Sequence, residues 1–90
     1  MKIIQTNRFR KAYKKLTKNQ LTAVNEAIRI IVANPQIGEQ KIGDLSWLKV
    51  YKFKCLGQLI LLGYSVNKEK IALTLIDIGS HENFYRDLKK

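Results

Sequence analysis

The only histidine of this chain, His81, stands close to the C-terminal end, with an aromatic and a cationic side chain following it. Tyr85 comes four residues later, and Arg86 is next in the sequence. An imidazole can move a proton near neutral pH. An arginine can hold phosphate oxygens through its planar guanidinium. These residue types suggest acid–base chemistry on a phosphodiester.

A second candidate group lies where lysines alternate with apolar residues, in the run Lys49-Val50-Tyr51-Lys52-Phe53-Lys54. If this run is a strand, its period of two places Lys52 and Lys54 on one face. Two ammonium groups there could hold successive phosphates, together with Lys49, and stabilise charge that develops during transfer. Tyr51 and Trp47 could stack on bases. The same pattern also fits an edge strand with solvated lysines, and Trp47 fits a core position equally well.

The geometry of the tail decides what His81 can do. A short helix after Ser80 would place His81 and Tyr85 on one face, pointing to solvent or a groove. Phe84 and Leu88, also four apart, would then dock on the sheet. The residues alone leave a second interpretation open, in which Tyr85 only packs and His81 ends a strand.

Charge and size narrow the classes of protein. The 90 residues carry 17 Lys and Arg against seven Asp and Glu, a formal charge of +10. Such a chain favours polyanionic partners: nucleic acid, an acidic protein or anionic lipid. The length predicts one domain, residues 1–90, with a modest core. The 46% of hydrophobic residues is typical of a globular chain.

Several functions are not expected. No apolar run approaches a membrane span, and residues 1–6 lack the apolar core of a signal peptide, which suggests a cytoplasmic protein without membrane contact. Cys55 is the only cysteine, which excludes an internal disulfide and a cysteine-built zinc site. We interpret it as a buried, inert thiol. With one histidine as well, neither a metal nor a cofactor is expected.

The elements that must position these residues begin with a short strand at Ile3-Ile4 and two helices. Thr6 can cap a helix over residues 7–16, whose outer faces are densely cationic. Thr17 and Gln20 match a capping box that opens the second helix, and Asn34-Pro35 ends it. The very short connection predicts that the two helices are antiparallel.

A loop over residues 36–46 separates the helices from three antiparallel strands at 47–55, 59–66 and 70–78. The last two are nearly continuous in apolar residues, so they are expected to be central. The turn between the first two falls at Leu56-Gly57-Gln58. The predicted fold class is therefore α+β, with one helical layer on one face of the sheet and the other face left for function.

The chain resembles bacterial toxins of the RelE/ParE superfamily from type II toxin–antitoxin systems. The resemblance rests on the two basic helices and on these segments: Asn34-Pro35, residues 41–45, Tyr51-Lys52-Phe53-Lys54, residues 63–66 and Ile78-Gly79. The run around Lys52 and Lys54 is similar to RelE, whose paired strand lysines are catalytic. The tail from Gly79 to Tyr85 is similar to the YafQ branch, in which a Gly-Ser/Thr-His motif supplies a catalytic histidine.

The resemblance implies a toxin that cuts mRNA on the ribosome without a metal and so inhibits translation. His81 would act as acid or base with Tyr85 as its aromatic companion, and Lys52 and Lys54 would hold the scissile phosphate with help from Arg86. A small acidic antitoxin would silence it and would be its only link to DNA. The chain departs from RelE at Leu61, where that toxin has an arginine, and its second arginine falls at His81.

Two other functions stay open from the sequence. ParE-type relatives share the fold and poison DNA gyrase, so a gyrase inhibitor without nuclease activity is the main alternative. A plain nucleic-acid or partner-binding module is the third, and it predicts salt-dependent binding to many sequences without cleavage.

Overall fold

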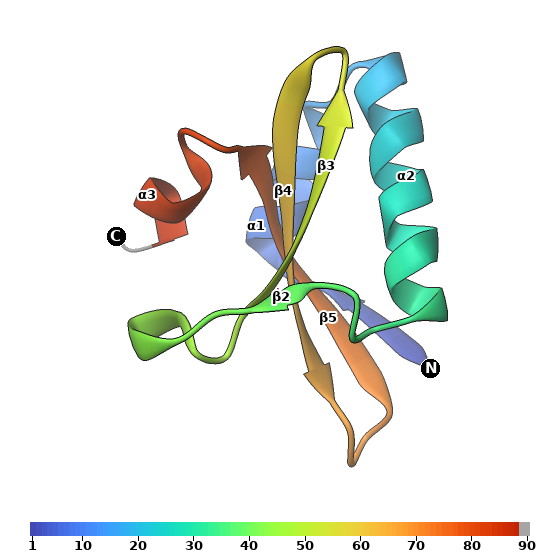
Figure 1. Cartoon of the computed structure of the whole chain (residues 1–90). Helices are drawn as coiled ribbons and strands as arrows, with labels where there is room; N and C mark the ends of the chain where they lie inside the picture. Colours follow the sequence, from blue (N-terminus) through green and yellow to red (C-terminus); the bar gives the residue numbers. More distant parts are fainter. Residues whose placement is uncertain (89–90) are drawn as a thin grey trace.

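A computed structural model describes residues 1–88, so that the last two residues of the predicted domain, 89–90, lie outside the description. Figure 1 shows the arrangement of the elements along the chain. Their order is β1 (Lys2–Gln5), α1 (Asn7–Lys14), α2 (Lys18–Ala33), β2 (Glu39–Gln40), the 3-10 helix η1 (Gly43–Leu45), β3 (Lys49–Cys55), β4 (Gln58–Asn67), β5 (Ala72–Ser80) and α3 (Phe84–Leu88).

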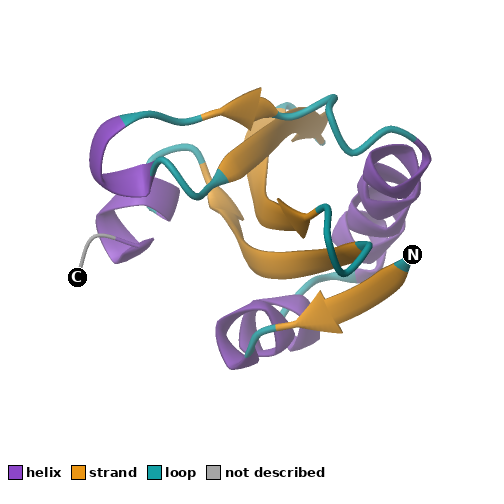
Figure 2. Cartoon of the chain, turned by 90° about the horizontal axis from the view of Figure 1, so that it is seen from below, coloured by secondary structure: helices purple, strands orange, loops and turns teal. Residues whose placement is uncertain are grey.

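The five strands form one sheet in the order β1-β5-β4-β3-β2. Only the β1–β5 pair is parallel; the other neighbours are antiparallel. The prediction of an α+β fold with central later strands is confirmed, since β4 occupies the middle of the sheet. Figure 2 shows the strands with α2 on one side and α3 on the other. No helix among residues 1–88 is long and apolar enough to cross a membrane.

Both long helices begin at the predicted caps. The Thr6 hydroxyl oxygen accepts a hydrogen bond from the Phe9 amide at 3.0 Å, and Thr17 and Gln20 form the complete capping box. The first helix ends at Lys14 rather than at Leu16, because the chain must turn at once into the next cap. The Leu16 amide donates to the Tyr13 carbonyl at 3.2 Å and tightens this last turn. The helices are antiparallel, as predicted (Figure 1).

The main core fills the space between the two long helices and the sheet. Its buried members are Phe9, Val24, Ala27, Ile31, Ile60, Leu62, Tyr64, Leu73, Leu75 and Ile78. The Tyr64 hydroxyl donates to the Pro35 carbonyl at 2.7 Å and accepts from the Gly38 amide at 2.9 Å. It therefore fixes the start of the loop that leads from α2 into β2.

The opposite side of the sheet, which we name the open face, carries a second and smaller core. It consists of Leu45, Leu48, Val50, Leu61 and Phe84. Phe84 is buried, and Leu88 packs beside it, which confirms that these two residues dock α3 on the sheet. The prediction that this face is left free is therefore wrong over the half that α3 and η1 cover.

The connections correct several boundaries. The β3–β4 turn places Leu56 and Gly57 at positive φ, 53° and 80°, which matches a tight hairpin and lets β4 begin at Gln58. The third strand begins at Lys49 rather than at residue 47, since the preceding residues form η1 and its exit turn. The last strand begins at Ala72 rather than at residue 70, because Ile71 turns the chain with φ of 49°. The sequence prediction missed β2 and η1 altogether.

Candidate functional site

His81 extends the ladder of the last strand instead of starting a helix. Its amide donates to the Leu59 carbonyl at 3.1 Å, and α3 begins only at Phe84. Ser80 is therefore not a helix cap, and its carbonyl accepts from the Asn83 amide within the intervening turn. The prediction that His81 and Tyr85 share a helical face is wrong, because the strand holds His81 in place.

The sheet register brings His81 into line with a candidate lysine. Lys54 faces Leu59 across the β3–β4 ladder, and Leu59 in turn bonds to His81. We name these three residues the His81 row. With strands about 4.8 Å apart, the α-carbons of Lys54 and His81 lie roughly 10 Å from each other. Long side chains from these two positions can reach one phosphate between them.

The surroundings of His81 are open. Its side chain is exposed at the end of the sheet, where it borders a hollow of about 320 Å³. The other residues around this hollow are Gly57, Gln58, Leu59, Ser80 and Glu82. Lys54 is also exposed and in addition borders a shallow hollow against α2. A polymer substrate can therefore approach the His81 row from solvent.

Lys52 lies on the open face beside an acidic residue of β2. Its ammonium nitrogen is 3.9 Å from one carboxylate oxygen of Glu39, and the other oxygen lies 3.1 Å from the Lys41 ammonium. The hydrogen bond from Lys41 and the charges of both lysines lower the pKa of Glu39. The Tyr85 hydroxyl, followed by Glu39, raises the pKa of Lys41 against an opposing effect of burial. Three charged groups thus share this part of the open face.

Tyr85 belongs to this lysine group and not to the His81 row. Its ring packs edge-on against Phe84, with centroids 5.2 Å apart, and the Lys41 ammonium lies over the ring at 5.2 Å from its centre. The hydroxyl oxygen is buried and interacts with the Lys41 ammonium, without a hydrogen bond of standard geometry. Tyr85 therefore packs on the open face beside Lys41, and its catalytic role with His81 stays a prediction.

The other predicted substrate-binding residues are scattered. Arg86 is exposed and donates to the Asn83 side chain. Tyr51 packs against the main core and stacks on Phe53, with ring centroids 5.9 Å apart. Trp47, half exposed, borders a hollow with Lys49 near the far ends of β3 and β4. Five residues of strand, about 17 Å, separate this hollow from the His81 row.

Leu61 is fully buried in the small core, where α3 covers it. A cationic side chain at this position would lie under Phe84 instead of facing solvent. At this departure from RelE the chain therefore has a core residue, and the cations of the open face lie on β3 and around β2.

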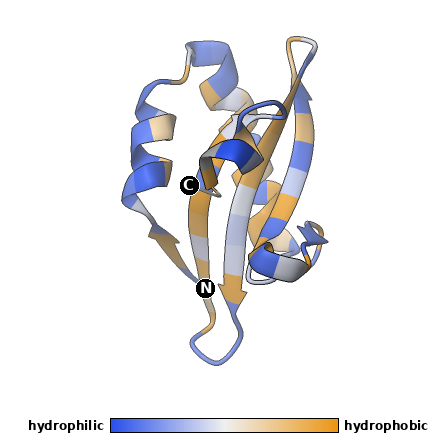
Figure 3. Cartoon of the chain, turned by 90° about the vertical axis from the view of Figure 1, so that its left-hand side faces the viewer, coloured by the Kyte–Doolittle hydropathy of each residue, from blue (hydrophilic) through white to orange (hydrophobic). Residues whose placement is uncertain are grey.

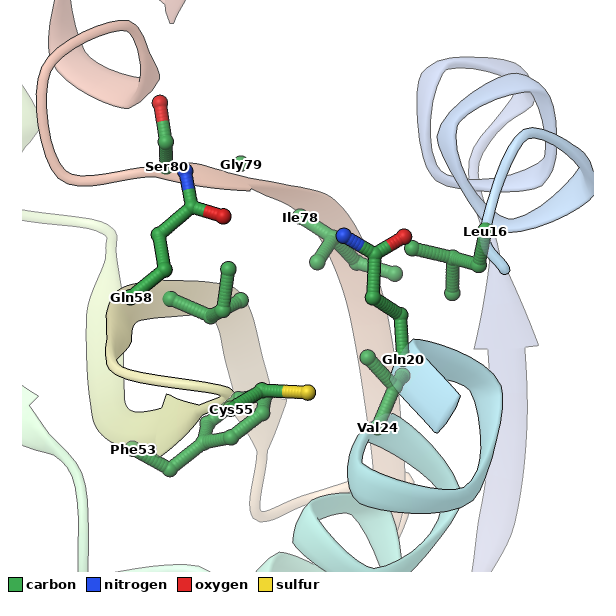
Figure 4. Close-up of a pocket in the computed structure, with 10 residues that line it drawn as sticks. Leu16, Gln20, Val24, Phe53, Cys55, Gln58, Ile78, Gly79 and Ser80 are labelled. Atoms are coloured by element: carbon green, nitrogen blue, oxygen red, sulfur yellow. The ribbon is translucent and has the colours of Figure 1, made fainter. Parts of the chain in front are cut away.

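Two further hollows flank α1 and α2. Figure 4 shows an apolar one of about 230 Å³ between α2, the β3–β4 hairpin and the end of β5, with Cys55 on its wall. Cys55 is half-buried rather than buried as predicted, and its thiol lies 3.9 Å from the Asn19 carbonyl. Another hollow, of about 540 Å³, lies between α1 and the start of α3 and is lined by Arg8, Lys11, Ala12, Lys15, Asp77, Ile78, Gly79 and Phe84.

Sequence reasoning missed Glu39 and Lys41 because it assigned residues 36–46 to a loop. The alternation of charged and polar residues after Gly38 was the available signal, but two residues are too few for a periodic pattern. It also missed Asp77, a buried carboxylate 3.5 Å from the Arg8 guanidinium. Its signal was an acidic residue inside an apolar strand. Among residues 1–88 no three His, Cys, Asp or Glu side chains are grouped to hold a metal.

The comparison with family models identifies one family. Residues 3–89 match the model of the ParE-like toxins of type II bacterial toxin–antitoxin systems. No curated protein matches the sequence at a significant level.

Solved structures with the same fold include the toxin in the intact RelBE toxin–antitoxin complex of E. coli. It is 20% identical, with a TM-score of 0.72 over 87% of this chain and 93% of that one. The toxin–antitoxin complex RelBE2 of Mycobacterium tuberculosis contains a chain that is 18% identical, with a TM-score of 0.76 over 89% and 96%. A metal-bound toxin from Helicobacter pylori is 23% identical, with a TM-score of 0.57 over 92% and 97%. These likenesses confirm the predicted fold.

Proposed function

The chain belongs to the family of ParE-like toxins of type II bacterial toxin–antitoxin systems, and we propose that it acts as an mRNA endoribonuclease. The observation that carries this proposal is the His81 row, in which an imidazole and an ammonium group flank one position on an open part of the sheet. A histidine that can exchange a proton and a lysine that can bind a phosphate are the groups that RNA cleavage requires.

In the proposed reaction the RNA 2′-hydroxyl attacks the adjacent phosphorus. A bond from the 2′-oxygen to phosphorus forms, the bond to the 5′-oxygen breaks, and the 2′-proton leaves to a base. His81 donates a proton to the departing 5′-oxygen or accepts the 2′-proton, while Lys54 stabilises the extra negative charge on the phosphate. Lys52, one exposed position along the same strand face, binds the backbone beside it. We propose translated messages on the ribosome as the substrate.

Induction of the chain in bacteria, followed by mapping of mRNA 5′ ends, tests this proposal. New ends within translated messages should appear with the wild type and vanish with His81→Gln and with Lys54→Ala. Lys70→Ala in the β4–β5 turn is the matched control, since it removes an exposed charge at the opposite end of this hairpin from the His81 row. Loss of one general acid or base typically costs about 10²- to 10⁴-fold in rate. Full cleavage by folded His81→Gln would refute the assignment.

A gyrase inhibitor is the second candidate, and a specific observation favours it. Part of the open face is covered by α3 over a small apolar core, and this part offers a surface for protein contact instead of an open catalytic groove. Supercoiling by purified gyrase in the presence of excess chain distinguishes the two functions. Inhibition that His81→Gln leaves intact, combined with unchanged mRNA ends, would favour the gyrase inhibitor.

We also propose an acidic antitoxin as the partner of this chain, because two of the similar structures are toxin–antitoxin complexes. The cations of α1 support it, and Figure 3 shows much of the α1 ribbon in the blue of hydrophilic residues. The hollow beside α1 adds apolar surface at the half-buried Ala12 to this charge. A partner that binds only the folded chain raises its melting temperature as the partner concentration increases above the dissociation constant. Unchanged melting across a titration with the candidate antitoxin would count against it.

A further inference from the structure

We propose that Lys41 and Lys52 form a second phosphate-binding site beside the His81 row, and that the Glu39 carboxylate occupies this site until RNA displaces it. The inference rests on the proposed function in one respect only, namely that the ligand is an RNA backbone. It assigns roles to Glu39 and Lys41, which follow from their contacts on the open face.

Lys41 is held in place more firmly than a surface lysine usually is. Its amide donates to the Leu48 carbonyl at 2.9 Å, and the neighbouring Gln40 side chain donates to the Leu48 and Ser46 carbonyls at 3.0 and 2.7 Å. Only 19% of its side chain is exposed, and its ammonium lies over the Tyr85 ring. The ammonium is therefore positioned before any ligand arrives, which lowers the entropic cost of binding an anion.

Glu39 makes the contacts that a phosphate would make. One carboxylate oxygen faces Lys41 at 3.1 Å and the other faces Lys52 at 3.9 Å. A phosphodiester also presents two non-bridging oxygens, so it can take the same place between the two ammonium groups. The Glu39 side chain is 61% exposed, and exposed ion pairs contribute little net stability. Displacement of Glu39 by a stronger anion is therefore easy.

The spacing of the lysines along β3 suits an RNA backbone that crosses the open face. Lys52 and Lys54 are two residues apart on β3 and share a face, so their α-carbons lie about 7 Å apart. That distance is comparable to the spacing of successive phosphates in a single strand. A backbone whose scissile phosphate lies at the His81 row can thus place the neighbouring phosphate between Lys52 and Lys41.

Tyr85 acts in this site as a positioning residue. Its ring packs against Phe84 and lies under the Lys41 ammonium, and its buried hydroxyl interacts with the same ammonium. Both parts of the side chain therefore help to position Lys41. Tyr85→Leu, which removes the ring and the hydroxyl, should weaken RNA affinity more than Tyr85→Phe, which keeps the ring.

The test measures binding without chemistry. A short 2′-O-methyl RNA cannot be cleaved, because its attacking hydroxyl is blocked, and fluorescence anisotropy gives its affinity for the full chain. We expect Glu39→Gln to bind about two- to fivefold tighter, since it removes the competing carboxylate. Glu26→Gln is the matched control: Glu26 is similarly exposed and paired with Arg29, but it lies on α2. It should tighten binding less than Glu39→Gln does.

Lys41→Met supplies the complementary measurement, because methionine keeps the hydrophobic contact with Tyr85 while the charge is lost. It should weaken binding more than Lys18→Met, which removes the same charge from α2. Equal effects of Glu39→Gln and Glu26→Gln, or of the two lysine variants, would overturn the site. Since the RNA cannot be cut, site-specific binding by a chain that cleaves no message would refute only the nuclease proposal.

Discussion

The two faces of the sheet differ in what their residues are used for. The face under α1 and α2 buries ten residues in total, which come from α1, α2, β4 and β5. Phe9, Ile31 and Tyr64 are among the largest of them. The open face buries five, and exposed lysines continue along β3 where that small core ends. Stability therefore comes mainly from one face, and the chemistry is available on the other.

The division between an apolar face and a cationic face explains how a chain with a formal charge of +10 can fold and still present a cluster of lysines. Burying a lysine costs much more than burying an apolar side chain, so the cations must lie where the sheet meets water. The small core under α3 brings Val50 and Leu61 out of solvent without covering Lys52 or Lys54. The result is a cationic strip bordered by apolar residues.

The sharpest test of the comparison uses two neighbouring leucines of β4. Leu62 and Leu61 are both fully buried, the first in the main core and the second in the small core. Truncation of a buried leucine costs about 2–5 kcal/mol, and more where the surroundings cannot collapse. We expect Leu62→Ala to lie at the upper end and Leu61→Ala at the lower end. Urea unfolding gives both values, and equal losses would show that the faces do not differ in this way.

The attachment of α3 depends on a glycine. A methyl group on Gly63 would meet the Phe84 ring at 2.7 Å and a Leu48 methyl at 3.1 Å. Overpacking of this kind typically costs about 1–3 kcal/mol, and we expect Gly63→Ala to release Phe84 and α3 from the open face. Amide exchange of residues 84–88 measures this release.

The control for that experiment is Gly79→Ala on the next strand. A methyl group there would lie 3.6 Å or more from Phe84, which is an ordinary contact. It should leave the exchange of α3 unchanged. If both alanine variants behave alike, Gly63 does not act by making room for Phe84.

Local signals in the sequence predicted most of the fold. Thr6, Thr17 and Gln20 marked the helix starts correctly because capping depends on a few adjacent residues. The apolar runs of β4 and β5 marked central strands. At Lys15 and Leu16 the end of α1 meets the start of α2, and the predicted first helix was two residues too long there.

The site was harder to predict because it depends on register and on a two-residue strand. The nearness of Lys54 to His81 follows from cross-strand pairing, which no local pattern encodes. The association of Tyr85 with Lys41 joins segments more than forty residues apart and required the position of β2. The spacing of four residues between His81 and Tyr85 led to the wrong prediction of a shared helical face. His81 instead pairs with Leu59 in the sheet, and the helix begins only at Phe84.

Tyr64 links the two faces, because it lies in the main core and fixes the loop that carries Glu39 to the open face. Tyr64→Phe removes a donor to the Pro35 carbonyl and an acceptor for the Gly38 amide. We expect a loss of about 1–2 kcal/mol from these unpaired groups, measured by thermal or urea unfolding. The amide signals of residues 38–41 should shift as well. A loss of stability with an unmoved β2 would mean that Tyr64 serves the core alone.

The smallest expected effect is confined to alkaline pH. Burial raises the pKa of Tyr64 above its ordinary value of 10.0, against the opposing hydrogen bond from Gly38. A folded pKa above the unfolded one means that the native state holds its proton longer. The associated stability is complete below pH 10 and declines as the pH rises through the folded value. The pKa of Lys41 is also raised, so the stability linked to its proton likewise declines as the pH rises above 10.5. Wild type should therefore lose stability above pH 10 more steeply than Tyr64→Phe does. Parallel curves for the two proteins would place the alkaline loss in other groups, with Lys41→Met as the next variant to compare.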